Sequence, residues 1–184
     1  MRIVAGAYRG RPLVAPKGHS TRPTADRTRQ ALFNVLEHAP WAPAFRGARI
    51  LDLFAGAGAL GLEALSRGAA FCLFVDRDAA ARAAIEANLL SLGCGSAGEV
   101  SQRDASAPGA LGPRPRFEFA FLDPPYGQGL AEAALGALTA GGWLAPGAVA
   151  IVERRADEAP LTAPGFRRLD ERRWGVARVE FLAV

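Results

Sequence analysis

The glycine-rich stretch "ILDLFAGAGALGLEAL" constrains the fold of this chain more than any other segment. It joins an apolar run that contains Asp52 to a helical pattern. Three glycines in G-x-G-x-x-G spacing lie between them: Gly56, Gly58 and Gly61. Asp76 ends the next apolar run, 20 residues after Gly56. A strand, a tight glycine turn, a helix and a second strand ending in an acid are typical of a ligand-binding βαβ unit.

The same alternation of strand and helix patterns continues along most of the chain. Strand patterns cover residues 48–54, 70–76, 98–104, 116–123 and 147–154, and helical patterns cover 58–68, 77–93 and 129–144. Two alternating runs in 165–184, separated by a turn near Trp174-Gly175, predict a C-terminal hairpin. The pattern therefore predicts an α/β, Rossmann-like fold, in which helices cover both faces of a parallel sheet that the hairpin makes mixed at one edge.

The proline-rich stretch "APWAPAFRG" suggests a boundary near residue 45. We expect residues 46–184 to form the α/β domain. Residues 1–45 are expected to form a smaller extension, made of a hairpin or extended arm, a loop and a helix whose apolar face runs through about His38. Thr24 is the predicted N-cap of that helix.

Charge is concentrated at the N-terminus. The chain has 184 residues and a net charge of +4, and the first 30 residues alone carry +6, with Asp26 as their single acid. A basic segment on a mildly acidic body favours a polyanionic partner such as RNA, although basic tails also aid solubility. The predicted phosphate contacts are Arg9, Arg11, Arg22, Arg27 and Arg29. Asp26 is expected to shape the adjoining loop or to pair with a neighbouring arginine.

Other features narrow the setting of the protein. No apolar run approaches the ~18 residues needed to span a bilayer, and the N-terminus does not resemble a signal peptide, so we expect a cytoplasmic protein. Cys72 and Cys94 lack metal-ligand spacing and are interpreted as reduced thiols. His19 and His38 stand alone, so no metal site is expected.

The glycine turn by itself fits two ligands. A dinucleotide would place its pyrophosphate at the helix N-terminus, where Asp52 would repel it. S-adenosylmethionine carries a positive sulfonium and an amino group instead of phosphate, and it suits the carboxylates at the strand ends. Asp76 is expected to meet the ribose diol and Asp104 the adenine amine, with Phe54 lining the turn. A turn without any ligand is the remaining structural alternative.

A second motif, "FLDPPYG", follows the fourth predicted strand. The Asp123 carboxylate and the Pro124 carbonyl can both accept hydrogen bonds from one exocyclic amine. Pro125 stiffens the loop, so the acceptors are held before substrate arrives. Tyr126 can stack on an extruded base. Asp123 is also expected to border the methyl donor, so the motif predicts methyl transfer to an amine.

Four blocks, "AGAYRGRPL", "RPTADRTRQALFNVL", "DLFAGAGALGLEALSRGA" and "FLDPPYG", together resemble the RsmD family, the class I 16S rRNA guanine-N2 methyltransferases. The resemblance covers nearly the whole chain. It implies a seven-stranded mixed sheet with a reversed last strand. It also implies S-adenosylmethionine as donor, S-adenosylhomocysteine as product, and a guanine of 16S rRNA as substrate within an assembling 30S particle. We expect a monomer.

Alternative functions remain at this point. A DNA adenine-N6 methyltransferase also uses D-P-P-Y, but the chain is too short for a separate target-recognition domain. An enzyme acting on a protein glutamine would be expected to carry Asn at the position of Asp123. A catalytically idle RNA-binding module would have no need of the glycine turn and D-P-P-Y together.

Overall fold

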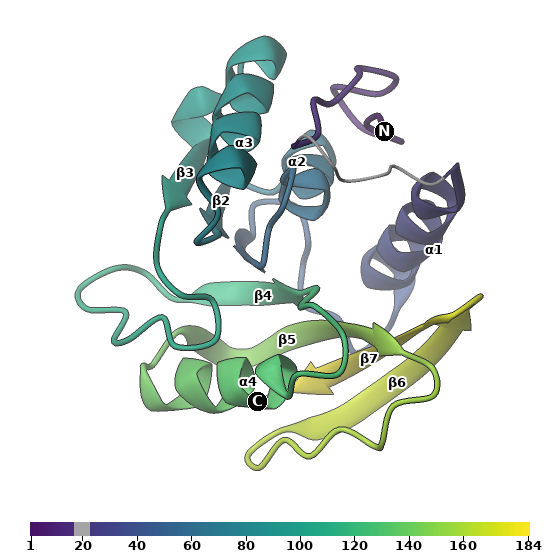
Figure 1. The fold of residues 1–184 in the computed structure, drawn as a ribbon, viewed down its shortest axis with the longest axis vertical. Coiled ribbons are helices and arrows are strands. Elements are labelled where there is room, and N and C mark those ends of the chain that lie inside the picture. The colour runs from purple at the N-terminus through teal and green to yellow at the C-terminus, as the bar shows by residue number, and fades with distance from the viewer. Residues whose placement is uncertain (17–22) are drawn as a thin grey trace.

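A seven-stranded mixed sheet forms the centre of the protein (Figure 1). The structure is a computed structural model that describes residues 1–16 and 23–184, with the backbone alone for 23–25. The strand order is β3-β2-β1-β4-β5-β7-β6. The strands are β1 (Arg49–Leu53), β2 (Phe71–Val75), β3 (Gly98–Ser101), β4 (Phe117–Leu122), β5 (Leu144–Arg155), β6 (Arg167–Trp174) and β7 (Ala177–Ala183). Strands β1 to β5 are parallel, and β7 runs antiparallel to both β5 and β6. The Rossmann-like α/β prediction and its reversed last strand are thus confirmed.

Helices cover both faces of the sheet. They are α1 (Pro23–His38), α2 (Ala59–Ser66), α3 (Ala79–Leu92) and α4 (Leu130–Ala140), with a short 3-10 turn, η1 (Gly95–Ala97). Helices α1, α2 and α3 pack in one hydrophobic cluster with one face of the sheet, and α4 packs in a second cluster on the opposite face. Of the helices in the described parts of the chain, none is long and apolar enough to cross a membrane.

The alternation of side chains along the strands produces these two clusters. On β4, Phe119 and Phe121 belong to the α1–α3 cluster, whereas Ala120 and Leu122 belong to the α4 cluster. All four side chains are almost completely buried. Such continuous apolar runs are what a parallel sheet covered on both faces requires. Cys72 of β2 and Cys94, which follows α3, are both buried free thiols. The prediction of reduced cysteines is therefore confirmed.

The register brings the polar strand ends to one edge of the sheet. Asp52 of β1 pairs with Phe74 of β2 and with Phe121 of β4. Leu122 of β4 pairs with Val152 of β5. The carboxyl ends of these parallel strands therefore meet along one edge, which is where open α/β sheets bind ligands.

The N-terminal segment is more closely integrated than the sequence suggested. Residues 2 and 12 form a single antiparallel bridge, so the segment is a small hairpin-like arm, but Ile3 and Leu13 are buried in the α1–α3 cluster. Phe45 joins the same cluster from beyond the helix. The described residues of this N-terminal part, 1–16 and 26–45, thus share a core with the α/β domain.

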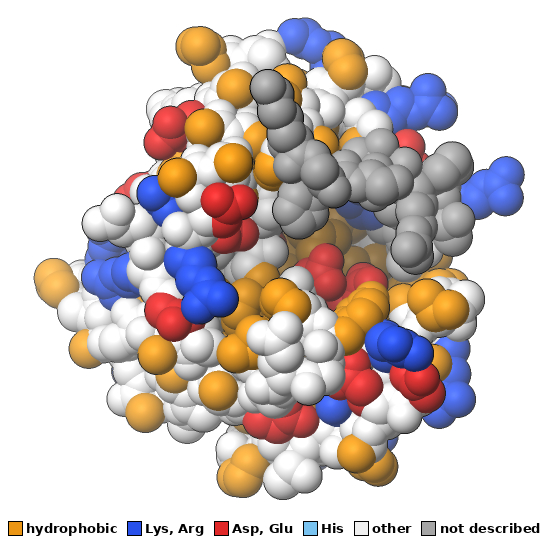
Figure 2. All heavy atoms as spheres, viewed as in Figure 1, with side chains coloured by type: hydrophobic (Ala, Val, Ile, Leu, Met, Phe, Trp, Pro, Cys, Tyr) orange, Lys and Arg blue, Asp and Glu red, His pale blue; other side chains and the backbone are white. Residues whose placement is uncertain are grey.

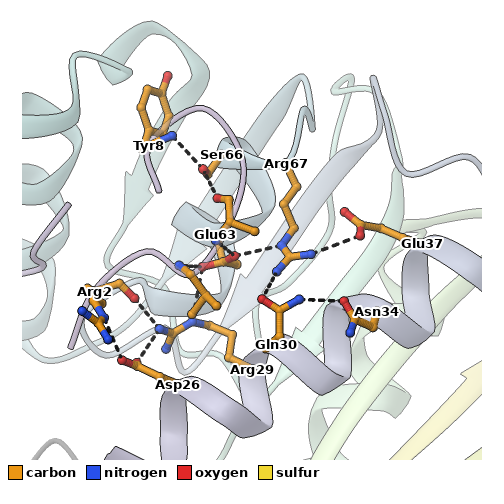
Figure 3. Close-up of polar contacts among 12 residues, drawn as sticks. Arg2, Tyr8, Asp26, Arg29, Gln30, Asn34, Glu37, Glu63, Ser66 and Arg67 are labelled. Carbon is orange, nitrogen blue, oxygen red and sulfur yellow. Dashed lines mark hydrogen bonds and ion pairs between the residues drawn. The ribbon is translucent and has the colours of Figure 1, made fainter. Parts of the chain in front are cut away.

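A buried ion network fixes this arm to α2 (Figure 3). The Glu63 carboxylate, which is fully buried, accepts hydrogen bonds from the backbone amides of Val4 and Ala5 at 2.8 and 2.9 Å. It also pairs with Arg29 and Arg67. These contacts join the arm, α1 and α2 into one unit.

Gly6 sits directly against the C-terminal turn of α2. It has φ +81°, and a Cβ atom at this position would lie far inside the contact distance of the Ser66 carbonyl. The amide of Ala7 donates to that carbonyl at 2.7 Å, and the amide of Tyr8 donates to the Ser66 hydroxyl at 3.0 Å. The arm therefore caps the end of α2, where unpaired carbonyls need donors. This explains why "AGAY" needs its glycine.

The start of α1 requires a correction. The helix begins at Pro23, so Thr24 lies within its first turn and is not the N-cap. Proline at the first helical position is favoured because its missing N–H would have had no partner there. Asp26 lies in the same first turn and pairs with Arg29 at 2.7 Å, so of the two roles expected for Asp26 the structure gives the ion pair.

Candidate active site

Two neighbouring cavities open at the carboxyl edge of the sheet. Cavity I has a volume of about 540 Å³, and its lining includes Phe54, Gly56, Asp76, Asp104, Asp123 and Tyr126. Cavity II has a volume of about 280 Å³ and lies on the α1–α2 side, between these helices and the β6–β7 turn. Figure 2 shows a hollow in the middle of this face, with hydrophobic side chains in its depth and acidic side chains at its edge.

The glycine turn after β1 is supported from beneath by Asp52. Its carboxylate is almost completely buried and accepts a hydrogen bond from the amide of Gly61 at 2.9 Å. Burial raises the pKa of Asp52 to about 8, an effect that the Gly61 N–H opposes and the negative charge of Asp123 reinforces. A Cβ atom at Gly61 would lie 2.3 Å from Phe74, so α2 can approach β2 only with glycine here. Gly58 takes φ +76° and begins α2.

Three of the residues predicted to contact the methyl donor lie in or beneath the glycine turn and support it. Asp52, Gly58 and Gly61 are absent from the lining of cavity I among the described residues. They shape the turn that brings Phe54 and Gly56 to the cavity. Both of these take positive φ, +59° and +54°, and Phe54 is the one non-glycine residue in the described chain that does so. A bulky residue held in this region signals a functional constraint.

Asp76 lies at the end of β2, facing the glycine turn. One carboxylate oxygen accepts from the amide of Gly56 at 2.9 Å, and the other accepts from the amide of Asp78 at 2.9 Å. These two bonds fix the orientation of the carboxylate beside cavity I. Each oxygen keeps a second lone pair with which it can accept from a hydroxyl group.

Asp104 lines cavity I together with Asp76 and lies three residues beyond the end of β3. Its Oδ1 atom accepts from both the hydroxyl and the amide of Ser106, at 2.7 and 2.8 Å. Both hydrogen bonds lower the pKa of Asp104, and the bond from the Ser106 hydroxyl has the larger effect. The carboxylate is thus ionised and oriented at the cavity wall.

The D-P-P-Y segment separates the two cavities. Asp123 and Tyr126 line both of them, whereas Pro124 and Pro125 line only cavity I. Desolvation, followed by the negative charge of Glu153, raises the pKa of Asp123 to about 7. The Tyr126 hydroxyl donates to Glu153 Oε1 at 3.0 Å, which fixes the ring at the rim. An acceptor with a pKa near neutrality thus stands where two ligands can meet.

Glu153 is the residue of this site that the sequence interpretation missed. It occupies β5 one position after Val152, whose partner in the parallel register is Leu122, the residue before Asp123. It lines cavity II together with Leu60, which was not assigned a role, and with Trp174 of the predicted hairpin. The signal available in the sequence was that the apolar runs of "GAVAIVER" and "RFEFAFLD" are each followed directly by an acid, Glu153 and Asp123.

The predicted phosphate contacts divide into two groups. Arg9, Arg11 and Arg27 are exposed, and Arg11 also donates to the carbonyl of Ser91. Arg22 lies outside the described residues. Arg29 needs a correction, because only 4% of its surface is exposed.

Arg29 is held by partners within the protein. Its guanidinium pairs with Asp26 at 2.7 Å and with Glu63 at 3.5 Å, and it donates to the carbonyl of Arg2 at 2.5 Å. These bonds fix α1 against the arm and leave the guanidinium unavailable to an exposed phosphate. Arg29 still forms part of the wall of cavity II.

This sheet order, with ligand cavities at its carboxyl edge and a polar motif after β4, is that of the class I methyltransferases. Two solved structures are similar over almost their whole length. The Escherichia coli protein yhhF has a TM-score of 0.84 and 34% identity, covering 100% of this chain and 97% of that one. Haemophilus influenzae HI0767 has a TM-score of 0.80 and 32% identity, covering 99% and 97%.

The particular family follows from the sequence comparisons. The family model described as "Conserved hypothetical protein 95" matches residues 1–183. Escherichia coli ribosomal RNA small subunit methyltransferase D is 40% identical over 164 residues, 89% of this chain and 79% of that protein. The Haemophilus influenzae protein of the same name is 36% identical over 178 residues, which are 96% of this chain and 90% of that protein. The chain belongs to this family, the RsmD family.

Proposed function

We propose that the protein transfers a methyl group from S-adenosylmethionine to the exocyclic N2 amine of a guanine in 16S ribosomal RNA. The observation that carries this proposal is the position of Asp123 and Tyr126, which line two cavities at once. Methyl transfer needs a donor and an acceptor that approach one another from opposite sides. Cavity I suits the donor, and cavity II suits an extruded base.

The residues of cavity I fit S-adenosylmethionine. Asp76 is held by two backbone amides with lone pairs remaining for the ribose hydroxyls. Asp104 offers a carboxylate to the adenine amine, and Phe54 offers an apolar wall. The acidic lining favours a cationic ligand and disfavours a pyrophosphate. When bound, S-adenosylmethionine supplies an electrophilic methyl group on its sulfonium.

The D-P-P-Y segment can activate an amine by geometry. The lone pair of an aryl amine is delocalised into its ring, so the amine is a poor nucleophile. Acceptors that draw its two N–H groups out of the ring plane localise that lone pair. The Asp123 carboxylate is one such acceptor and the Pro124 carbonyl is the other, and the two prolines hold them rigidly. Asp123 also faces the positive charge that develops on nitrogen during transfer.

Tyr126 can hold the base flat beside these acceptors. Stacking of an aromatic side chain on a base contributes roughly 1–3 kcal/mol. A base in folded RNA has to leave its stack to reach a cavity of this kind, and this costs a few kcal/mol. The hydrogen bond from Tyr126 to Glu153 keeps the ring in place before the base arrives.

The proposed substrate is small-subunit RNA within an assembling 30S particle, and the enzyme is expected to act as a cytoplasmic monomer. Two relatives carry small-subunit ribosomal RNA in their names. Arg9, Arg11 and Arg27 are exposed, and Arg27 directly precedes Thr28, which lines cavity II. Arg11 lies farther along the arm, where it donates to the carbonyl of Ser91 near the end of α3. We propose that these arginines contact RNA phosphates, Arg27 close to the extruded base and the two arm residues farther from it.

Replacement of Asp123 by alanine tests the proposed role of this motif. We expect methyl transfer to 30S particles to fall by about 100-fold or more, because an acceptor for the amine and for the developing charge is lost. S-adenosylmethionine binding, measured by isothermal titration, should persist because Asp76 and Asp104 remain. The matched control is Asp157→Ala, which removes an exposed acid paired with Arg155. Transfer by the Asp123 variant within about tenfold of wild type would overturn the assignment.

A further inference from the structure

A second carboxylate stands beside D-P-P-Y in the cavity proposed for the base. Asp123 and Glu153 follow the paired residues Leu122 and Val152 on adjacent parallel strands. Such strands lie about 4.8 Å apart, and residues at equivalent positions point to the same face. Both residues line cavity II. An incoming base therefore meets two carboxylates side by side.

The orientation of Glu153 is fixed by a hydrogen bond, and in the described part of the chain this carboxylate has no cationic partner. Tyr126 donates to Oε1 at 3.0 Å. Within residues 1–16 and 26–184, no arginine or lysine lies within ion-pair distance of Glu153. Arg29, which lines the same cavity, is engaged by Asp26 and Glu63. A partly buried carboxylate is costly without a partner, so a ligand that brings donors would relieve the cost.

The pattern of hydrogen-bonding groups on the bases decides which ligand fits. Guanine presents two adjacent donors, N1–H and the N2 amine. Adenine presents its N6 amine beside N1, which is an acceptor. Two neighbouring carboxylates complement the first pattern. With adenine, the second carboxylate would face a lone pair. A site built to bond an N–H group rejects analogues without it by factors that reach about 10⁴.

We propose that Glu153 is the specificity-determining residue of this site, accepting the N1–H of guanine while Asp123 accepts from the N2 amine. This inference rests on the proposed function and adds to it the feature that distinguishes guanine from other amino-purines. Tyr126 acts as a positioning residue for Glu153 through its hydroxyl. The D-P-P-Y motif can thus act on the amines of different bases, and the residue that follows Val152 on the neighbouring strand β5 determines which base binds.

The test uses a base that keeps the 2-amine of guanine but replaces the N1–H donor by an acceptor nitrogen and the 6-oxo group by an amine. 2,6-Diaminopurine carries the same N2 amine as guanine, but its N1 is an acceptor. Once the methylated position is mapped, small-subunit RNA is prepared with guanine or diaminopurine there and is presented both free and in reconstituted 30S particles. Single-turnover transfer from labelled S-adenosylmethionine is then measured for each base with the full-length wild-type chain and its variants.

We expect wild type to prefer guanine strongly and Glu153→Gln to reduce that preference by about tenfold or more, since a glutamine amide can donate to N1 of diaminopurine. Tyr126→Phe, which keeps the ring, should reduce the preference in the same direction but less. Glu99→Gln, which alters an exposed acid on β3, should leave the preference unchanged. S-adenosylmethionine titration reports whether each variant is folded.

The outcomes separate the inference from the proposed function. If wild type methylates no guanine N2, the proposed function fails. If wild type does so and Glu153→Gln keeps the full preference for guanine over diaminopurine, only the role of Glu153 is overturned. An equal loss of transfer to both bases would likewise contradict a role in base selection, because it would show that Glu153 acts on the reaction without distinguishing N1–H from N1.

Discussion

The rate of methyl transfer should depend on pH through the ionisation of Asp123. Desolvation and the charge of Glu153 raise the pKa of Asp123 to about 7. Both oxygens of the carboxyl group are free to accept hydrogen bonds from the amine only when the group is ionised. Methyl transfer should therefore be lost as the pH falls through the pKa of Asp123. The ionised fraction is about one tenth at one unit below the pKa and about nine tenths at one unit above it, so the rate should rise roughly tenfold between pH 6 and 8.

Several charged or titratable groups surround Asp123 and enter this prediction. They are Asp52 of β1, Arg29 of α1, Glu153 of β5 and Tyr126, which lies in the same loop as Asp123. Because Glu153 contributes to the raised pKa, Glu153→Gln should move the acidic limb of the profile to lower pH. Desolvation of the carboxyl group by the surrounding protein remains in the variant, so the pKa of Asp123 should not return fully to its ordinary value.

The assay is single-turnover transfer at saturating RNA and S-adenosylmethionine from pH 5.5 to 8.5, so that binding does not shape the profile. Binding of both ligands is measured separately at each pH. A flat profile across this range would refute the assignment of Asp123 as the ionised acceptor. A profile that Glu153→Gln leaves unmoved would show that the two carboxyl groups do not interact.

Two further predictions concern packing and RNA binding. Gly61→Ala should lower the free energy of unfolding by about 1–3 kcal/mol in urea titration, because its Cβ atom would lie 2.3 Å from Phe74. The control Gly136→Ala lies in an open part of α4 and should instead stabilise by about 0.5–1 kcal/mol; equal effects would contradict the packing argument. Replacing Arg9 and Arg27 together by alanine should weaken RNA binding and reduce the slope of log affinity against log salt by about 1.5, and an unchanged slope would exclude both as phosphate contacts.

Substitution is the appropriate test of the arm because its deletion would damage the core. Removing residues 1–22 would take Ile3 and Leu13 out of the α1–α3 cluster. It would also leave the buried Glu63 carboxylate without two of its backbone donors. A loss of RNA binding after such a deletion could not be separated from unfolding.

Most of the fold could be predicted from local patterns. The apolar strands, the glycine turn and the helices are specified by residues that lie close together in sequence, and the edge of the sheet where Asp76, Asp104 and Asp123 meet follows from parallel topology. The contacts of the arm could not be predicted in this way. Glu63 accepts from Val4 and Ala5 across almost 60 residues, and nothing in the neighbourhood of a helical glutamate indicates such partners.

The site was only partly predictable for the same reason. Motif spacing identified several of the residues that line cavity I. It also included Gly58 and the pair Asp52 and Gly61, which contact each other beneath the turn. Arg29 was predicted to be an exposed phosphate contact, but its burial results from tertiary contacts that the local sequence does not show. Glu153 was missed because its role depends on the register of β5 against β4, which pairs residues 30 positions apart.

The most direct test identifies the methylated nucleoside. The protein is incubated with labelled S-adenosylmethionine and, separately, with free 16S ribosomal RNA, 30S particles lacking the modification, and DNA, and the products are digested to nucleosides. We predict label in N2-methylguanosine from small-subunit RNA or particles. Label in N6-methyladenine from DNA, or no transfer to any of the three, would contradict the proposed reaction.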